Sequence, residues 1–326
     1  MGAIEGQKTA LVEKGNILLV GLCCIDEVNI VKKYPNEDSE TRIFEKYLTL
    51  GGNVANSAVV ARQLTSQVQV CASLPIANPQ LTALLDAAKI DTTLSIPRTD
   101  PKTEVPVSTC ILNETAGSRT VFHYRGNLPE IEADEFVRRV VKDEVLSKVG
   151  WIHFEGRNFD HLETMMQKVR EWRHGNSRQE PVISVEFEKI RDFNYFERLT
   201  QHADVIFMSK DFAKNKGWGD AGAAIEALKK EHAKAASSDA SNLKVICPWG
   251  EQGVYGQANG DIIHVPAEKV NVVDSLGAGD CFIGACIWAL WNGYEFPKAL
   301  EIANHVAATK CAQRGLQNLN LKGIKI

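Results

Sequence analysis

The stretch Val273-Asp274-Ser275-Leu276-Gly277-Ala278-Gly279-Asp280 leads directly into an apolar run with helical character, residues 281–291. Its glycines allow a sharp turn and let a ligand approach the backbone closely. The helix start that follows offers free N–H groups and the positive end of a dipole, so this segment suits an anion. Asp280 is either a first-turn carboxylate favoured by that dipole or a general base that takes a proton from a hydroxyl group.

A second glycine-rich helix start, Gly51-Gly52-Asn53-Val54-Ala55-Asn56, lies far upstream and opens a predicted helix over residues 53–64. Asn53 and Asn56 are three residues apart, so they share one face of the first turn and could offer amide groups to the hydroxyls of a polyol. The alternative is a plain glycine turn with an asparagine cap. The presence of two such helix starts in one chain favours a ligand site.

The rest of the chain alternates apolar, β-branched runs with segments of helical period. This order predicts crossover units and a mainly parallel sheet covered by helices on both faces, within one domain over residues 16–326. Residues 1–15 are predicted to be a flexible extension. Four short strands without intervening helices are predicted to form a small antiparallel sheet at the edge where the parallel strands end, over residues 24–31, 42–50, 105–112 and 119–124.

Composition narrows the class of partner. The chain has 326 residues and a formal charge of -4, which gives no basic field for nucleic acid or anionic lipid. The longest apolar stretch falls short of the roughly 20 residues that span a bilayer. Eight cysteines without a C-x-x-C pair are expected to be free thiols in a reducing, cytoplasmic compartment. Small molecules are the expected partners.

Together, the two glycine-rich segments resemble the two signatures of the ribokinase-like (PfkB) carbohydrate kinases, in the family's order and at about its separation. The resemblance covers nearly the whole chain after residue 15, and residues 33–40, 151–158 and 209–214 are similar to the branch that phosphorylates ketohexoses. It implies a three-layer α/β/α fold with a four-stranded β lid. It also implies transfer of a phosphoryl group from ATP, with Mg²⁺, to a sugar, foremost to the 1-hydroxyl of D-fructose, and leaves K⁺ open.

The resemblance also assigns roles to residues. The residue matching Asp280 is the base, and the amides matching Gly277, Ala278 and Gly279 hold the phosphoryl charge. The positions that match sugar contacts are Asp26, Gly51, Gly52, Asn53 and Asn56. Taken alone, a strand-end aspartate such as Asp26 is more often a turn residue.

On the nucleotide side, the resemblance places Arg119 near the ATP phosphates, where a planar guanidinium suits bidentate contact. It places Trp249, Gly250, Gly253 and Asn304 beside the nucleotide. For Trp249 the alternative is an indole buried in the core. Glu155 and Arg157 either form a simple surface pair or orient the phosphate and the water shell of magnesium.

Two departures from the family pattern qualify this assignment. The Asn-x-x-Glu motif for magnesium and phosphate, common in the family, is missing after the strand that ends in Met208-Ser209-Lys210-Asp211. Residues 74–83 lack the usual glycine-and-aspartate pattern of a sugar-side loop. The metal shell and one sugar contact therefore stay open.

Other functions remain as alternatives. Ribose, the 6-position of fructose or a nucleoside could be the acceptor, and a catalytically inactive relative could bind nucleotide or sugar as a sensor. A dinucleotide-dependent oxidoreductase is disfavoured, because residues 21–26 lack a Gly-x-Gly-x-x-Gly turn.

Apolar side chains on both faces of the predicted lid would need a cover. We therefore expect a homodimer through the lid. By resemblance, Asp38 would then approach the neighbouring site.

Overall fold

The computed structural model describes residues 14–189, 194–235, 242–322 and 324. Residues 1–13, most of the predicted N-terminal extension, lie outside this part of the chain. The first element, β1, begins at Asn16 and ends at Val20.

The main sheet has eight strands in the order β14-β13-β12-β11-β10-β9-β1-β4. Neighbouring strands from β12 to β4 are parallel, and β13 and β14 extend the sheet in antiparallel fashion. In sequence order, the strands other than β1 are β4 (Val68–Cys71), β9 (Val149–Phe154), β10 (Val182–Phe187), β11 (Val205–Met208), β12 (Lys244–Pro248), β13 (Val254–Gln257) and β14 (Ile263–Val265). The fully buried runs of β9 and β11 are typical of a parallel strand covered on both faces.

Helices cover both faces of this sheet, so the domain has the three predicted layers. Each face has its own cluster of buried side chains. One cluster includes α1 (Asn53–Leu64), α2 (Pro79–Ala87), α9 (Ala278–Trp291) and α10 (Phe296–Cys311). The other includes α3 (Ala133–Val140), α4 (Asp143–Leu146), α5 (Phe159–Gly175), α6 (Asn194–Thr200), α7 (Lys210–Asn215) and α8 (Ala221–Ala235). A short parallel pair, β5 (Ser73–Pro75) and β6 (Ile96–Arg98), and the turn η2 (Gly250–Gln252) complete the described elements.

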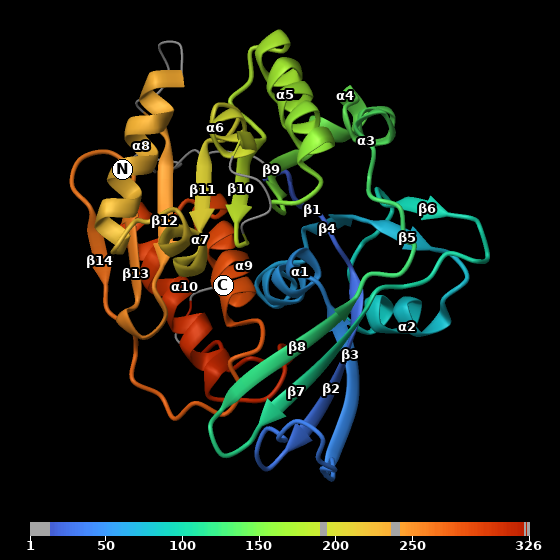
Figure 1. Ribbon diagram of the computed structural model, residues 1–326. Helices are drawn as coiled ribbons and strands as arrows, with labels where there is room; N and C mark the ends of the chain where they lie inside the picture. Colours follow the sequence, from blue (N-terminus) through green and yellow to red (C-terminus); the bar gives the residue numbers. More distant parts are fainter. Residues whose placement is uncertain (1–13, 190–193, 236–241, 323, 325–326) are drawn as a thin grey trace, which may run out of the picture.

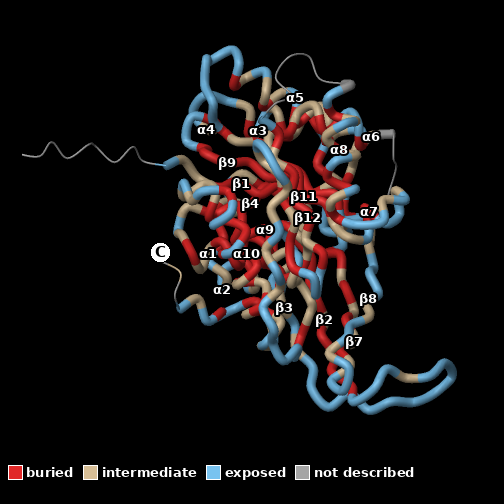
Figure 2. Tube along the Cα trace, turned by 90° about the vertical axis from the view of Figure 1, so that its left-hand side faces the viewer, coloured by how far each residue is buried: buried red, intermediate tan, exposed pale blue. Residues whose placement is uncertain are grey.

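A separate four-stranded sheet, called the lid below, projects from the body beneath α1 in the view of Figure 1. Its order is β3 (Glu45–Gly51), β2 (Cys24–Val31), β7 (Val107–Asn113) and β8 (Ser118–Tyr124). The central pair, β2 with β7, is parallel, so the prediction of a wholly antiparallel sheet is wrong. The chain returns to the body between these two strands, which lets both run in the same direction. Figure 2 shows exposed chain along β8 and at the far end of the lid.

Two helices of the body, α1 and α9, meet closely. A Cβ atom added to Gly284 of α9 would lie 2.4 Å from the carbonyl oxygen of Ser57 in α1. No larger residue fits there without moving one helix. This contact brings the starts of α1 and α9, which carry the two glycine-rich motifs, side by side.

Candidate active site

Asp280 lies in the first turn of α9, after Gly277 adopts a left-handed backbone at φ 74°. Asn56 of α1 donates its amide to the Asp280 carboxylate at 2.8 Å, and Ser57 donates to the Asp280 carbonyl at 3.0 Å. Burial raises the pKa of Asp280 well above its usual range. The Asn56 bond opposes this effect, and the charges of Glu188, Glu155 and Asp26 add to it. The result is a fixed carboxylate with a high affinity for a proton.

The anion loop, residues 274–280, is anchored by the side chain of Asp274. Its carboxylate accepts from the Leu276 amide at 2.8 Å and from the Gly315 amide at 3.2 Å. The buried ammonium of Lys310 donates to the same carboxylate at 2.7 Å. Both members of this ion pair are almost wholly inaccessible. The orientation of the amides from Gly277 to Gly279 is therefore set by a rigid support behind the loop.

The structure brings Asp26 against Gly51, so two of the residues predicted to contact the sugar lie together. A Cβ atom on Gly51 would lie 2.1 Å from a carboxylate oxygen of Asp26, and one on Gly52 would lie 2.2 Å from the carbonyl oxygen of Leu22. Asp26 is buried, which raises its pKa, while hydrogen bonds from Ser108 and Cys24 lower it. Glycine is thus needed at position 51 for the backbone to lie this close to Asp26, and at position 52 for it to lie this close to the Leu22 carbonyl.

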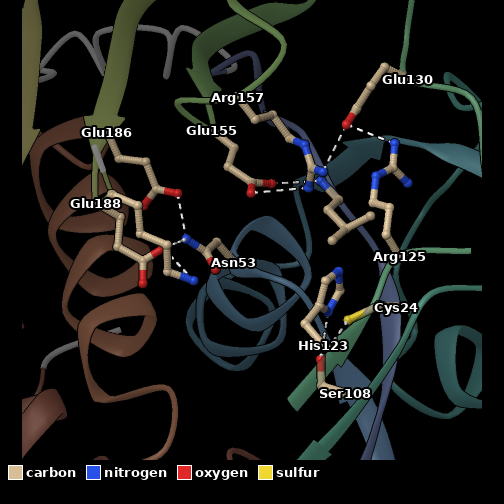
Figure 3. Close-up of polar contacts among 12 residues, drawn as sticks. Cys24, Asn53, Ser108, His123, Arg125, Glu130, Glu155, Arg157, Glu186 and Glu188 are labelled. Carbon is tan, nitrogen blue, oxygen red and sulfur yellow. Dashed lines mark hydrogen bonds and ion pairs between the residues drawn. The ribbon is translucent and has the colours of Figure 1, made fainter. Parts of the chain in front are cut away.

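Asn53 reaches a pair of carboxylates that the sequence analysis did not identify. Its amide donates to Glu186 at 2.8 Å and to Glu188 at 2.9 Å (Figure 3). Both glutamates lie at the carboxyl end of β10. Burial, then the charges of Glu155, Asp280 and Glu188, raise the pKa of Glu186 well above its usual range. The signal that could have found them is the alternation Glu186-Phe187-Glu188 at the end of a buried parallel strand, where ligands bind in open α/β sheets.

Glu155 and Arg157 form a buried ion pair at the end of β9, so the interpretation as a surface pair is wrong. The two are 6% and 7% exposed, and a guanidinium nitrogen lies 3.2 Å from the carboxylate. Glu155 also accepts from the Leu22 amide at 2.7 Å, and Arg157 contacts Glu130 at 2.9 Å (Figure 3). A buried pair of this kind needs all its partners, because a charge left alone is costly.

The residues predicted to contact the nucleotide lie on separate elements of the fold: β8, α10 and the turn after β12. Arg119 of the lid donates to the Ser275 hydroxyl of the anion loop at 3.2 Å. The Asn304 amide donates to the Pro266 carbonyl at 2.7 Å. Trp249 is buried in the core, with the Lys210 ammonium 6.0 Å from its ring centroid, which matches the alternative of a core indole.

Gly250 and Gly253, also predicted to contact the nucleotide, both adopt positive φ in the turn between β12 and β13, at 63° and 93°. A Cβ atom on Gly253 would lie 2.1 Å from the Val265 carbonyl oxygen, whereas one on Gly250 would meet open space. Close packing against β14 therefore requires glycine at position 253, whether or not Gly253 contacts a nucleotide. Asp38 is exposed in the loop between β2 and β3 at φ 57°, in the part of the lid that the single chain leaves uncovered.

None of the described helices is long and apolar enough to cross a membrane. Within the same residues no group of three or more His, Cys, Asp or Glu side chains is arranged to hold a metal ion. Mg²⁺ is commonly bound by only one or two carboxylates together with substrate phosphates. The paired carboxylates of Glu186 and Glu188 fit that requirement.

Sequence comparison relates the chain to known proteins. Residues 14–322 match the family model described as pfkB family carbohydrate kinase. The chain is 32% identical to ketohexokinase of Mus musculus over 94% of its own length and 99% of the relative's. It is 24% identical to ribokinase of Bacillus subtilis (strain 168) over 93% of the chain and 94% of the relative.

Solved structures share the fold. Ribokinase from Giardia lamblia superimposes with a TM-score of 0.75 at 16% identity, covering 93% of this chain and 94% of that one. Arabidopsis thaliana ribokinase complexed with ribose and ATP gives 0.70 at 15% identity, covering 92% and 94%. At such identities the likeness establishes the ribokinase-like fold.

Proposed function

The chain belongs to the pfkB family of carbohydrate kinases and is a sugar kinase; we propose that its acceptor is D-fructose and its product fructose 1-phosphate. The support for fructose is the identity of 32% to a ketohexokinase across nearly the full length of both chains. The observation that carries the chemistry is Asp280, fixed by Asn56 at 2.8 Å at the start of a helix.

In the proposed reaction, the 1-hydroxyl oxygen of the sugar attacks the γ-phosphorus of ATP. The hydroxyl proton passes to the Asp280 carboxylate, and the bond between the γ-phosphorus and the β,γ-bridging oxygen breaks to release ADP. Burial supports this role, because it raises the pKa of Asp280 and with it the affinity for that proton. The amides of Gly277, Ala278 and Gly279 stabilise the charge on the transferred group.

The sugar hydroxyls would be held by the carboxylate of Asp26 and by the backbone beside Gly51 and Gly52. Asn56 supports this assignment: its side-chain carbonyl oxygen is buried and has no hydrogen-bond partner among the described residues, so it can accept a hydroxyl. The Asn53 amide already donates to Glu186 and Glu188, so Asn53 would contact the sugar only together with these glutamates.

For the nucleotide, we assign Arg119 to the phosphates, where it lies beside Ser275 of the anion loop. We also assign to the nucleotide Gly250 and Gly253, in the turn between β12 and β13, and Asn304 of α10. When bound with ATP, Mg²⁺ supplies charge neutralisation on the phosphates, and Glu186 and Glu188 would hold it or its water shell. Glu155 and Arg157 would orient the phosphate and that water shell.

The lid supports a homodimer as part of this proposal. Several large apolar side chains on β8 and beside β3 are exposed: Phe44 50%, Phe122 55% and Tyr124 57%. A second copy would cover them and bring Asp38 toward the neighbouring site. Sedimentation at micromolar concentration tests this, and a monomer would contradict it. All eight cysteines are free and seven are buried, which supports the cytoplasm as the compartment.

The test of the acceptor is ADP release from MgATP with fructose, ribose, glucose, adenosine or no sugar, in potassium and in sodium buffer. Phosphorus NMR of the product identifies the phosphorylated carbon. We expect fructose to give the highest kcat/KM and a 1-phosphate. Preference for ribose, or a 6-phosphate product, would refute the proposed acceptor while leaving the sugar-kinase assignment intact.

A further inference from the structure

A row of polar side chains crosses the lid at the strand ends nearest the site. Asp26 of β2 is in register with Ser108 of β7, and Ser108 is in register with His123 of β8. Side chains directly opposite one another in neighbouring strands lie on the same face of a sheet. All three therefore share the face on which Asp26 meets Gly51.

The rest of this face is largely apolar. The next rows carry Val28 opposite Cys110 and Ile30 opposite Leu112, which form a small buried cluster with Leu276 of the anion loop packed against it. The lid thus uses apolar contacts to sit on the body. The apolar contacts that hold the lid on the body do not account for the polar row of Asp26, Ser108 and His123.

The row is connected by hydrogen bonds. The Ser108 hydroxyl lies 3.1 Å from Nδ1 of His123 (Figure 3). Ser108 is in register with Asp26, and its hydrogen bond is the first of the effects that lower the pKa of the Asp26 carboxyl against burial. The Cys24 thiol donates to Asp26 at 3.5 Å and lies 3.8 Å from the Ser108 oxygen. Asp26 is 6% exposed, so these neighbours replace much of the water that would otherwise solvate it.

The number of protons fixes the direction of this chain. A serine hydroxyl has one proton to donate, and an ionised carboxylate can only accept. Ser108 can give its proton to Asp26 only if it does not spend it on His123. Nδ1 of His123 must then carry a proton and donate to the serine oxygen.

We propose that Ser108 and His123 are positioning residues for the sugar, because the chain from His123 through Ser108 holds the Asp26 carboxylate in place as an acceptor for sugar hydroxyls. This inference rests on the proposed sugar contact of Asp26. It assigns to the lid a part in acceptor affinity that is separate from the phosphoryl chemistry at Asp280. The effect of breaking the chain should therefore fall on fructose binding and not on turnover at saturation.

The variants are Ser108→Ala, His123→Phe and His123→Gln. Ser108→Ala should raise KM and Kd for fructose about tenfold, the factor expected from losing one hydrogen bond to a charged group. His123→Phe should do the same, because a phenyl ring cannot direct the serine proton. His123→Gln should retain most of the affinity, since its amide can donate in place of Nδ1. For all three, kcat and KM for ATP should change less than threefold.

Thr109→Ala is the matched control, because Thr109 is adjacent in β7 but points to the opposite face. The double variant Ser108→Ala/His123→Phe should bind fructose no more weakly than either single variant, since both break the same chain. Thermal melts identify any variant that fails to fold, and His123→Gln then carries the comparison.

Calorimetric titration with fructose, run without nucleotide, separates this inference from the proposed function. Fructose that binds without being phosphorylated, and binds more weakly to Ser108→Ala, would refute the reaction but support the chain. Normal turnover with unchanged fructose KM and Kd in Ser108→Ala and His123→Phe would overturn the chain alone. Absence of any fructose binding to the wild type would overturn both.

Discussion

Replacing Lys310 by methionine should lower the free energy of unfolding by about 3–5 kcal/mol, the usual cost of removing one partner of a buried ion pair. The Lys310 side chain is 0% exposed and that of Asp274 is 1% exposed, with 2.7 Å between nitrogen and oxygen. The ammonium also donates to the Asp274 carbonyl oxygen at 2.9 Å. Methionine nearly fills the space but donates nothing, so a buried carboxylate and a buried carbonyl lose their shared donor.

The expected change in melting temperature follows from chain length. Unfolding entropy of about 2.1 cal/mol/K per residue gives about 0.7 kcal/mol/K for this chain of 326 residues. The predicted loss therefore corresponds to a fall in Tm of about 4–7 °C, measured by circular dichroism. Lys298→Met is the control on the same helix: Lys298 pairs with Glu301 at 2.8 Å, but both side chains are exposed. Its Tm should move by about 1 °C or less.

A double variant tests the physical reason. Lys310→Met combined with Asp274→Asn removes the unpaired buried charge, so it should melt above Lys310→Met alone. An asparagine oxygen can still accept from the Leu276 amide, which keeps the loop anchored. If Lys310→Met melts with the wild type, or if the two changes simply add, a buried ion pair does not support the anion loop.

Three further predictions concern the site. Because burial raises the pKa of Asp280, the native state binds the extra proton more tightly than the unfolded state does, and stability falls as pH rises through that window. Asp280→Asn should therefore melt above the wild type at about pH 8 and lose that advantage near the ordinary aspartate pKa of 3.8; an equal gap at both pH values would contradict this. Gly51→Ala should raise the KM for fructose by about tenfold or more and leave the KM for ATP unchanged, because the added Cβ would lie 2.1 Å from an Asp26 carboxylate oxygen and push that carboxylate away. A Cβ on Gly175 would meet no atom within 4 Å, so the control Gly175→Ala should leave both KM values unchanged. Asn56→Leu should lower kcat by about tenfold but should add no further loss to Asp280→Asn; additive effects would separate Asn56 from the base.

Much of the fold could be predicted because its signals are local. Buried parallel strands are continuous apolar runs, so β9 and β11 stand out in the sequence. Gly52 and Gly277 are required by backbone geometry, with φ of 97° and 74°, and such positions mark both helix starts directly. The direction of β2 relative to β7 could not be predicted, because a strand's own pattern carries no information about its partner.

The parts of the site that were missed depend on tertiary contact. Glu186 and Glu188 look like ordinary polar residues after a strand, and only the tertiary structure brings the Asn53 amide, at the start of α1, within hydrogen-bond distance of both. Arg157 is 7% exposed although arginine is rarely buried, and its partner Glu130 lies 27 residues away in sequence. Ser108 and His123 acquire meaning only through the register of the lid strands.

The most direct test of the central claim compares Asp280→Asn with the wild type in steady-state fructose phosphorylation, with ATP and fructose binding measured on the same samples. The account predicts that kcat falls by about 10²- to 10⁴-fold, the usual contribution of a positioned general base, while both ligands still bind. A variant that binds both ligands and turns over within about threefold of the wild type would show that Asp280 is not the base.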